Sequence, residues 1–311
     1  MSVALVLEPV VPDGLAPEEL PGASPGGGAT ERAVTAAIIV APLLGAGYAI
    51  YRWWGEGIGV GDLVLAALFY VIVGHGITVG FHRLMTHRSF TARRPLKIAL
   101  AIVGSMAFQG GPIGWVADHR RHHAKADRPG DPHSPHGHGP GIGGQLRGLW
   151  HAHIGWLLNH SPTSWRRYAN DLLKDRDLVL INKLFPVWCV ASLALPFGIG
   201  YVFGGLPGAL TALLWAGAVR ICLLHHVTWS INSICHMVGR RPFATVDRST
   251  NVGALALLSF GESWHNGHHA FPHSARHGVL RGQLDSSAAL ISLFERLGWA
   301  TDVHRVRAPQ A

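Results

Sequence analysis

Histidine is the residue type whose number and spacing point to chemistry in this chain. The sequence has 21 histidines, more than its 18 aspartates and glutamates combined. A His-x-x-His-His sequence occurs twice, at residues 119–123 and 265–269, and places histidines at positions i, i+3 and i+4. These positions fall on one face of a helix. We therefore expect each copy to direct three imidazole rings at a single point, where a metal ion would bind.

Two further pairs of residues complete the candidate ligand set. Asn232 and His236 are at i and i+4 and share a helix face. His82 and His87 are five residues apart, about 140° around an ideal helix, so we expect the chain to unwind near Met85. The candidate metal ligands are His82, His87, His119, His122, His123, Asn232, His236, His265, His268 and His269.

Nine imidazoles are more than one metal ion binds. A tetrahedral zinc ion is satisfied by four ligands, so the number predicts two metal ions with four or five nitrogens each. Imidazole binds iron, zinc, copper and nickel, and the ligand type alone does not select among them. Among the other histidines, we expect a solvated loop for His133, His136 and His138. We expect hydrogen-bonded, buried positions for His75, His225 and His226.

Four long uncharged runs must position these ligands. Only 14% of the residues are charged, whereas 48% are hydrophobic. Each run approaches the ~20 residues that cross a bilayer. The runs pair into two hairpins, residues 34–51 with 63–81 and residues 184–203 with 208–224. The sequence therefore predicts an all-α integral membrane protein with four transmembrane helices in two hairpins.

Two other apolar runs are not expected to cross the membrane. Residues 96–115 are long enough, but a crossing would separate His87 from His119, so we expect a re-entrant or interfacial segment. Residues 251–260 are too short, and we expect them to begin a buried or surface-lying helix. The three cysteines lack a C-x-x-C spacing, so no disulfide framework or thiolate-held cluster is expected.

The distribution of positive charge predicts the orientation. The net charge is +8, and 15 lysines and arginines lie between the two hairpins, with 8 more from Arg240 onward. The hairpin loops hold only Arg52, so both termini and all four ligand groups are expected on the cytoplasmic side, in a helical cap. The apolar runs argue against a nucleic-acid-binding protein. Arg220, inside the fourth run, is expected to snorkel toward the membrane surface.

Together the four ligand groups resemble those of a known enzyme family. The chain reads His82-Arg-Leu-Met-Thr-His87, His119-Arg-Arg-His122-His123, Asn232-Ser-Ile-Cys-His236 and Gly-Glu-Ser-Trp-His265-Asn-Gly-His268-His269. These motifs resemble the membrane fatty-acyl desaturases of the stearoyl-CoA (delta-9) type, from about residue 40 to residue 300. The resemblance implies a membrane desaturase domain over residues 31–304, flanked by a disordered tail at 1–30 and a short tail at 305–311.

The resemblance also implies the chemistry. The nine histidines would bind two Fe ions as a non-haem di-iron centre, and Asn232 would reach one iron through a water. With O2 and two electrons, the enzyme would introduce a cis double bond into a saturated C16–C18 fatty acyl chain, expected at carbon 9. Because the chain lacks a haem-domain motif, we expect a separate electron donor, a ferredoxin or flavoprotein reductase. The expected location is a bacterial cytoplasmic membrane.

Further residues match positions that contact the substrate in this family. Gly74 would allow a deep acyl tunnel and Tyr70 would close it, whereas the other matched positions shape the bend near the reacting carbons. The expected substrate-binding residues are Tyr70, Gly74, Gln109, Trp115, Thr228 and Trp229. Positions that bind CoA in relatives differ here, at Gly110 and at residues 159–161.

The head group of the substrate and the docking site of the donor remain open at this stage. The acyl chain could be carried by CoA, a lipid or an acyl-carrier protein. Candidate replacements for the missing CoA contacts are Arg120, Arg121, Arg147, Arg166 and Arg167. A candidate docking face for an acidic electron donor comprises Arg240, Arg241 and Arg276. Two alternatives to a desaturase are a membrane di-iron hydroxylase and a non-enzymatic metal transporter or sensor.

Overall fold

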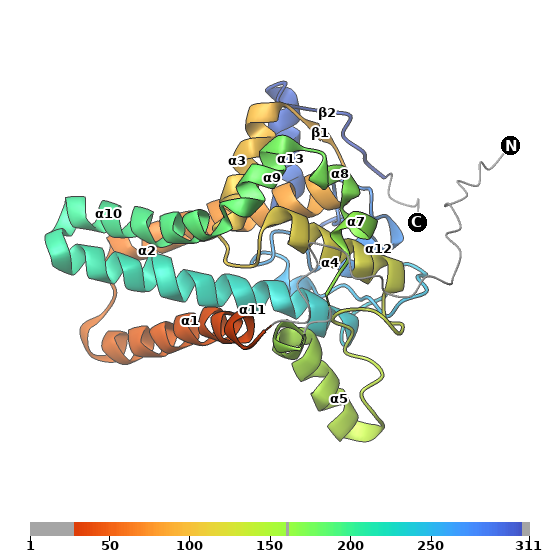
Figure 1. The fold of residues 1–311 in the computed structure, drawn as a ribbon, viewed down its shortest axis with the longest axis horizontal. Coiled ribbons are helices and arrows are strands. Elements are labelled where there is room, and N and C mark those ends of the chain that lie inside the picture. Colours follow the sequence, from red (N-terminus) through yellow and green to blue (C-terminus); the bar gives the residue numbers. More distant parts are fainter. Residues whose placement is uncertain (1–27, 160–161, 307–311) are drawn as a thin grey trace, which may run out of the picture.

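The structure is a computed structural model that describes residues 28–159 and 162–306. Most of the two expected terminal tails, and His160 and Ser161, lie outside these residues. The described chain is mostly helical, with one small antiparallel sheet in which Thr91 pairs with Thr301. Long helices extend to one side of the molecule, and shorter helices gather at the other (Figure 1).

Three helical segments are long and apolar enough to cross a membrane, residues 29–52, 60–86 and 185–236. The helices that make up these segments are α1 (Ala29–Glu56), α2 (Val60–His75), η1 (Gly76–Thr86), α10 (Phe185–Ala212), η3 (Leu213–Val219), α11 (Arg220–Ser233) and η4 (Ile234–His236). Residues 96–115 are not among them. Their apolar run is divided between α3 and α4, in agreement with the expectation that it does not form one spanning helix.

The third segment folds back on itself. Gly205 has non-helical torsion angles of φ 60° and ψ −154°, and the chain reverses there. A left-handed φ suits glycine because it lacks a Cβ atom. The backbones of Gly200 and Gly208 meet across the reversal, where a Cβ on Gly200 would lie 2.3 Å from the Gly208 oxygen. The two arms therefore run side by side (Figure 1).

The helix that carries His82 and His87 widens instead of unwinding. After α2, residues 76–86 form the π-helix η1, and the His87 amide donates to the His82 carbonyl at 3.1 Å. In a π-helix, residue i bonds to residue i+5, so two residues five apart lie on the same side. The two rings are 4.9 Å apart between centroids. The prediction that the helix unwinds near Met85 is therefore wrong.

The shorter elements form a cap over the ends of the long helices. They are β1 (Thr91–Ala92), α3 (Arg94–Ser105), α4 (Pro112–Lys125), α5 (Gly141–Trp150), η2 (His151–Gly155), α6 (Trp156–Leu158), α7 (Trp165–Tyr168), α8 (Asn170–Leu173), α9 (Arg176–Lys183), η5 (Gly253–Leu255), α12 (His265–Ala270), α13 (Ser286–Arg296) and β2 (Ala300–Thr301). Arg120 on α4 donates to the carbonyls of Met85 and Thr86, which joins α4 to the end of η1.

Residues 251–260 do not begin an α-helix, contrary to expectation. Asn251 instead forms backbone bridges to Arg240 and Trp264. Its side-chain oxygen accepts hydrogen bonds from the amides of Asn266 and Gly267, at 2.9 and 3.2 Å, in the first turn of α12. The Asn251 backbone therefore stays extended, and only the 3-10 turn η5 follows it.

Arg220 does not reach the membrane surface. Its side chain is buried, and the guanidinium donates to the Ser192 hydroxyl at 2.8 Å and to the Ala216 carbonyl at 2.9 Å. Longer bonds reach the carbonyls of Ser192 and Met106. The expected snorkelling is wrong because these acceptors on α10 and at the end of α3 satisfy the charge inside the protein.

Candidate metal centre

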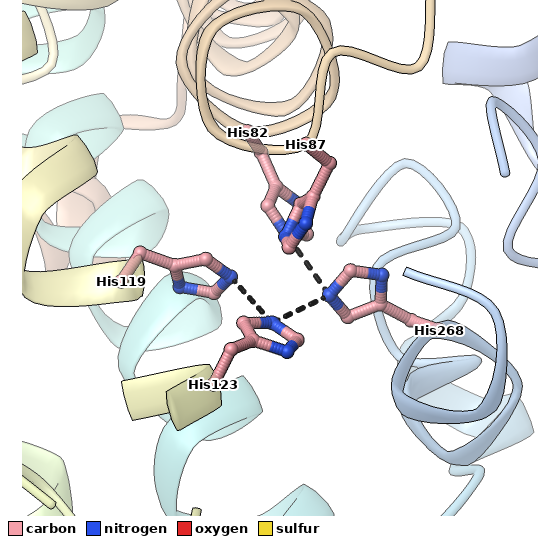
Figure 2. Close-up of side chains that lie close together, drawn as sticks. All are labelled: His82, His87, His119, His123 and His268. Carbon is pink, nitrogen blue, oxygen red and sulfur yellow. Dashed lines mark hydrogen bonds between the residues drawn. The ribbon is translucent and has the colours of Figure 1, made fainter. Parts of the chain in front are cut away.

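The candidate ligands gather in two neighbouring clusters. The first cluster is His82, His87, His119, His123 and His268. The second cluster is His122, His236, His265 and His269. Within each cluster, one ring nitrogen of every member lies within 4.8 Å of those of the others. Figure 2 shows the first cluster, with rings from η1, from His87 directly after it, from α4 and from α12 directed at a common centre.

Close nitrogen–nitrogen approaches define both centres. In the first cluster, the Nε2 atom of His268 lies 3.1 Å from that of His82 and 2.9 Å from that of His123. In the second cluster, the Nε2 atom of His265 lies 3.0 Å from that of His236 and 3.0 Å from that of His269. These rings come from segments far apart in the sequence.

Each His-x-x-His-His sequence divides its histidines between the two clusters. On α4, His119 and His123 belong to the first cluster and His122 to the second; on α12, His268 belongs to the first and its neighbours to the second. The expectation that three rings aim at one point is therefore wrong. Positions i and i+4 are about 40° apart around a helix, but i+3 and i+4 are about 100° apart. A helix lying between two centres thus presents i and i+4 to one centre and i+3 to the other.

Four carboxylates hold histidines of both clusters by their outer nitrogens. The Nδ1 atoms of His122, His236 and His269 lie 3.0, 2.9 and 3.0 Å from carboxylate oxygens of Asp131, Asp127 and Asp247. Nδ1 of His82 hydrogen-bonds to Glu262. A carboxylate that accepts a hydrogen bond from Nδ1–H fixes the orientation of the ring. The Nε2 atom then carries the electron pair that can bind a metal ion. Sequence reasoning missed these residues, although Glu262 lies within the quoted fourth motif and Asp127 follows closely after the second.

Burial and neighbouring charge set the protonation of the site. Burial holds the pKa of His119, His123 and His268 well below the ordinary value, and neighbouring histidines lower it further. These rings are therefore neutral at pH 7, as metal ligands must be. Burial also lowers the pKa of His122, but Asp131 outweighs it and raises that pKa above the ordinary value. The Asp131 carboxyl is correspondingly held at a low pKa despite its burial.

The donor set fits metal ions. Among the described residues, the buried Nε2 atoms of His87 and His122 have no hydrogen-bond partner. Neutral imidazoles whose nitrogens face one another at about 3 Å place their electron pairs together, and a cation between them removes that repulsion. Each cluster is therefore suited to hold a metal ion that favours nitrogen ligands. The three cysteines are free and belong to neither cluster.

A buried ion-pair network contacts the first cluster through Glu262, which hydrogen-bonds to His82. Arg83 is fully buried and donates to Glu262 at 2.9 Å and to Asp285 at 2.9 Å. Asp285 also accepts from the Ala288 amide and so caps α13. Because Glu262 holds His82, the network connects the position of that ligand to the C-terminal helix. No spacing in the sequence signals this connection.

Two cavities beside the clusters share part of their lining. The deep cavity is lined by residues that include Gly74, Phe260 and His82. The outer cleft, of about 370 Å³, is lined by residues that include Gln109 and Trp229. Residues shared by both cavities are Trp115, His119, Thr228 and Asn232. Because His119 is also in the first cluster, a molecule that passed from one cavity to the other would pass the candidate metal site.

The expected substrate residues are placed around these cavities, with two differences. Gln109 donates to the Thr228 hydroxyl at 3.0 Å, which connects a residue of the outer cleft to one that lines both cavities. Tyr70 lines neither cavity; its hydroxyl donates to the Leu258 carbonyl at 2.7 Å. The space beside Gly74 is not open, because a Cβ there would lie 2.1 Å from the Phe260 ring. Phe260, which sequence reasoning missed, therefore fills the depth that Gly74 was expected to provide.

Two histidines expected in a solvated loop are held at the site. His133 is buried, and its ring stacks on His122 with centroids 4.3 Å apart. Nε2 of His136 lies 2.8 Å from the His236 carbonyl. The expectation is wrong for both, because Asp127 and Asp131 bind backbone amides and Ser134 and fold the loop onto the cluster.

Histidines outside the clusters have ordinary partners. His225 is buried with Nε2 2.9 Å from the Ala107 carbonyl. His75 is also buried and hydrogen-bonds to the Val71 carbonyl. Their expected hydrogen-bonded burial is confirmed. His226 is half-buried and contacts His153 at 3.0 Å.

Apolar helices long enough to span a membrane, with two histidine clusters beside a cavity, are the arrangement of a membrane enzyme whose histidines could hold metal ions. The family model for fatty acid desaturases matches residues 53–284. A hex-5-enoyl-[acyl-carrier protein] acetylenase of Moorena producens is 41% identical over 85% of this chain and 83% of its own length. An sn-1 stearoyl-lipid 9-desaturase of Anabaena variabilis is 39% identical over 81% and 85%.

A third relative, an acyl-CoA C20 Delta5-desaturase of Anemone leveillei, is 40% identical over 77% of this chain and 72% of its own length. The chain therefore belongs to the fatty acid desaturase family. The expectation of an oxidoreductase of the desaturase type is confirmed. Membership implies an acyl substrate and O2, in place of the transporter or sensor alternative.

Proposed function

We propose that the protein is an O2-dependent membrane desaturase that introduces a cis double bond at carbon 9 of a saturated C16–C18 acyl chain. The observation that carries this proposal is that His119, a member of the first cluster, lines both the deep cavity and the outer cleft. An acyl chain that fills both cavities would present its middle carbons to the metal site. The name of the Anabaena relative, a stearoyl-lipid 9-desaturase, supports carbon 9 and this chain length.

The two histidine clusters would each hold one iron ion, and Asn232 lines both cavities together with His119 of the first cluster. When bound, the iron ions supply the oxidising chemistry that removes one hydrogen from each of two adjacent methylenes, using O2 and two electrons. The protein's own contribution is positioning, because neighbouring methylenes are chemically alike. Trp115 stacks on His119 with ring centroids 5.1 Å apart, which fixes both the ligand and one wall shared by the two cavities.

The end of the deep cavity would set the chain length. Phe260 packs on Tyr70 and His75 with ring centroids 5.3 and 4.5 Å apart. These contacts hold its ring against Gly74, so the methyl end of the acyl chain would stop at Phe260. The apolar residues of the cavity lining, among them Ile77, Leu224 and Val227, would exclude water from the acyl chain.

The membrane arrangement follows from the apolar helices and the charge distribution. We propose four membrane crossings: α1, α2 with η1, and the two arms on either side of Gly205. The clusters and both termini would face the cytoplasm of a bacterial cell. A separate ferredoxin or flavoprotein reductase would supply the two electrons, and exposed Arg240 is a candidate contact. Arg241 and Arg276 are further candidates; their guanidinium groups also donate to the nearby carbonyls of Asp247 and Gly278.

Expression together with a reductase in a host that lacks unsaturated fatty acids tests this function. We expect monounsaturated C16 and C18 chains whose double bond is located at carbon 9 by mass spectrometry. A hydroxylated product would favour the membrane hydroxylase alternative. Absence of any product from protein that contains its full complement of iron would contradict the proposal.

A further inference from the structure

We propose that the acyl chain enters from the side, out of the bilayer, as part of a glycerolipid whose head group carries no net negative charge. This inference rests on the proposed desaturase function and adds the substrate class. It assigns the outer cleft as the entrance, with α1 on its membrane side, and it excludes acyl-CoA as the principal substrate.

The position of the outer cleft supports lateral entry. Four of its lining residues belong to α1, which is the first of the segments able to span a membrane: Val34, Thr35, Ile38 and Ile39. The opposite side includes Trp156 and Leu157 of α6 and Phe185 at the start of α10. A cleft with a membrane helix as one wall opens where lipid chains are present. Val34 is 54% exposed, so this wall is not covered by other parts of the described chain.

The charge of the cleft opposes a polyphosphate head group. The charged residues that line it, as far as the structure describes the chain, are Glu31 and Asp118, and neither lysine nor arginine is among them. Phosphate groups are normally bound by arginine and lysine side chains. The carboxylate of Glu31 would repel the phosphates of CoA, and also an anionic lipid head group, so it favours a zwitterionic or uncharged lipid.

None of the arginines considered as substitutes for missing CoA contacts lines either cavity. Arg120 binds Asp171 at 2.6 Å, besides the carbonyls at the end of η1. Arg121 donates to the Gly130 carbonyl at 2.9 Å, and Arg147 to the His138 carbonyl at 3.1 Å. Arg166 and Arg167 are exposed on α7 but line neither cavity.

Helix α5 supplies an independent sign of membrane contact close to the entrance. Ile142, Leu146 and Trp150 are 75%, 60% and 59% exposed and recur every four residues, so they form one apolar stripe. Figure 1 shows α5 running across the direction of α1 and α11, away from the body of the cap. A short helix with such a stripe is suited to lie in the membrane surface. The chain passes directly from α5 through η2 to the α6 wall of the cleft.

The test uses the full-length protein with bound iron, reconstituted with ferredoxin and ferredoxin reductase in vesicles. Deuterated distearoyl-phosphatidylcholine, distearoyl-phosphatidylglycerol and stearoyl-CoA are offered separately. We expect phosphatidylcholine to be desaturated at least tenfold faster than stearoyl-CoA, and phosphatidylglycerol to be slower than phosphatidylcholine. Glu31→Arg should reduce the difference between the two lipids. Faster desaturation of stearoyl-CoA than of either lipid would overturn the proposal.

A substitution at the entrance distinguishes an effect on substrate entry from an effect on the metal site. Ile38→Trp should lower the rate on phosphatidylcholine at least tenfold without changing the iron content. The matched control is Leu44→Trp on the same helix, where Leu44 is 68% exposed and does not line the cleft; it should keep the parental rate. Equal rates in both variants would contradict entry beside α1.

A binding measurement decides the inference even without turnover. A benzophenone amino acid in place of Ile38 should crosslink to the acyl chain of phosphatidylcholine and not to stearoyl-CoA. Crosslinking to lipid in protein that desaturates no substrate would leave the lateral entrance supported and the proposed reaction contradicted. Crosslinking to stearoyl-CoA in preference to lipid would overturn the entrance instead.

Discussion

The Nε2 atoms of His123 and His268 lie 2.9 Å apart, although 145 residues separate them in the chain. His123 is the last histidine of its motif on α4, whereas His268 is the middle histidine of the motif on α12. The two motifs therefore contribute to both clusters in opposite proportions, two histidines to one and one to the other. This exchange couples the two candidate metal sites through two rigid helices.

Removal of the carboxylate behind His122 should weaken the second metal site. In Asp131→Asn, the negative charge that accepts the hydrogen bond from His122 Nδ1 is lost. The imidazole ring is then held less firmly in its orientation. Loss of such a partner commonly costs a metal site 10–100-fold in affinity. We expect the iron content to fall from about two to about one per chain by mass spectrometry. Asp302→Asn, at an exposed position, should retain the full content; unchanged iron in Asp131→Asn would contradict the role of Asp131.

Acid should destabilise the cap through Asp171. Partial burial would raise the pKa of Asp171, but hydrogen bonds from Arg120 and Arg88 outweigh it and lower the pKa to about 2. Because the pKa of Asp171 is lower in the folded than in the unfolded protein, its carboxylate stabilises the fold at pH values above the unfolded pKa of about 4. This stabilisation is lost as the pH falls toward 2. Because Asp171 is only half-buried, we expect its charge to contribute about 1 kcal/mol to the free energy of unfolding.

Thermal unfolding in detergent across pH 3 to 7 measures this contribution. Asp171→Asn should lower the melting temperature at pH 7, and its difference from the parent should shrink as the pH falls below 4. A difference that stays constant over this range would show that the charge of Asp171 is not responsible.

Replacement of Phe260 should lengthen the accepted acyl chain. Phe260→Ala removes the ring that lies against Gly74, so the deep cavity extends toward α2. We expect the ratio of C20 to C18 product to rise severalfold, with a stability cost of about 3–5 kcal/mol for the buried ring. Phe243→Ala, which removes a ring packed on Phe271 outside both cavities, should leave the ratio unchanged. An unaltered ratio in Phe260→Ala would place the chain end elsewhere.

Arg220 should maintain the bend of the acyl channel. It donates to Met106 directly and to Ser192, whose hydroxyl in turn donates to the Met106 carbonyl at 2.7 Å. Arg220→Met leaves these buried acceptors without their charged donor, at a cost of about 2–4 kcal/mol. The segment before Gln109 should then move, and we expect double bonds at carbons next to the normal position. Arg220→Lys should give an intermediate product distribution; a single unchanged product in Arg220→Met would refute this role.

The sequence was sufficient to predict the helical class, the apolar helices and the family. Long uncharged runs and helical histidine spacing are local properties of the sequence, so they can be recognised without knowledge of the fold. The residue assignments to metal and substrate remain predictions, although the nine histidines lie in two compact groups.

The placement of individual rings could not be predicted, because it depends on how helices lie against one another. His119 and His122 lie on the same broad face of α4. Because α4 lies between the two centres, His119 joins the first cluster and His122 the second. The supporting carboxylates Asp127 and Asp131 act through loop folding, which has no periodic signal. The burial of Arg220 depends on acceptors from α10 and α3 that are distant in sequence.

Diffraction at the iron absorption edge from crystals of the iron-loaded protein would locate the metal ions relative to the two clusters. We expect two anomalous peaks per chain, one surrounded by His119, His123 and His268 and the other by His122, His265 and His269. A single peak, or one peak bound by all three histidines of the α4 motif, would contradict this expectation.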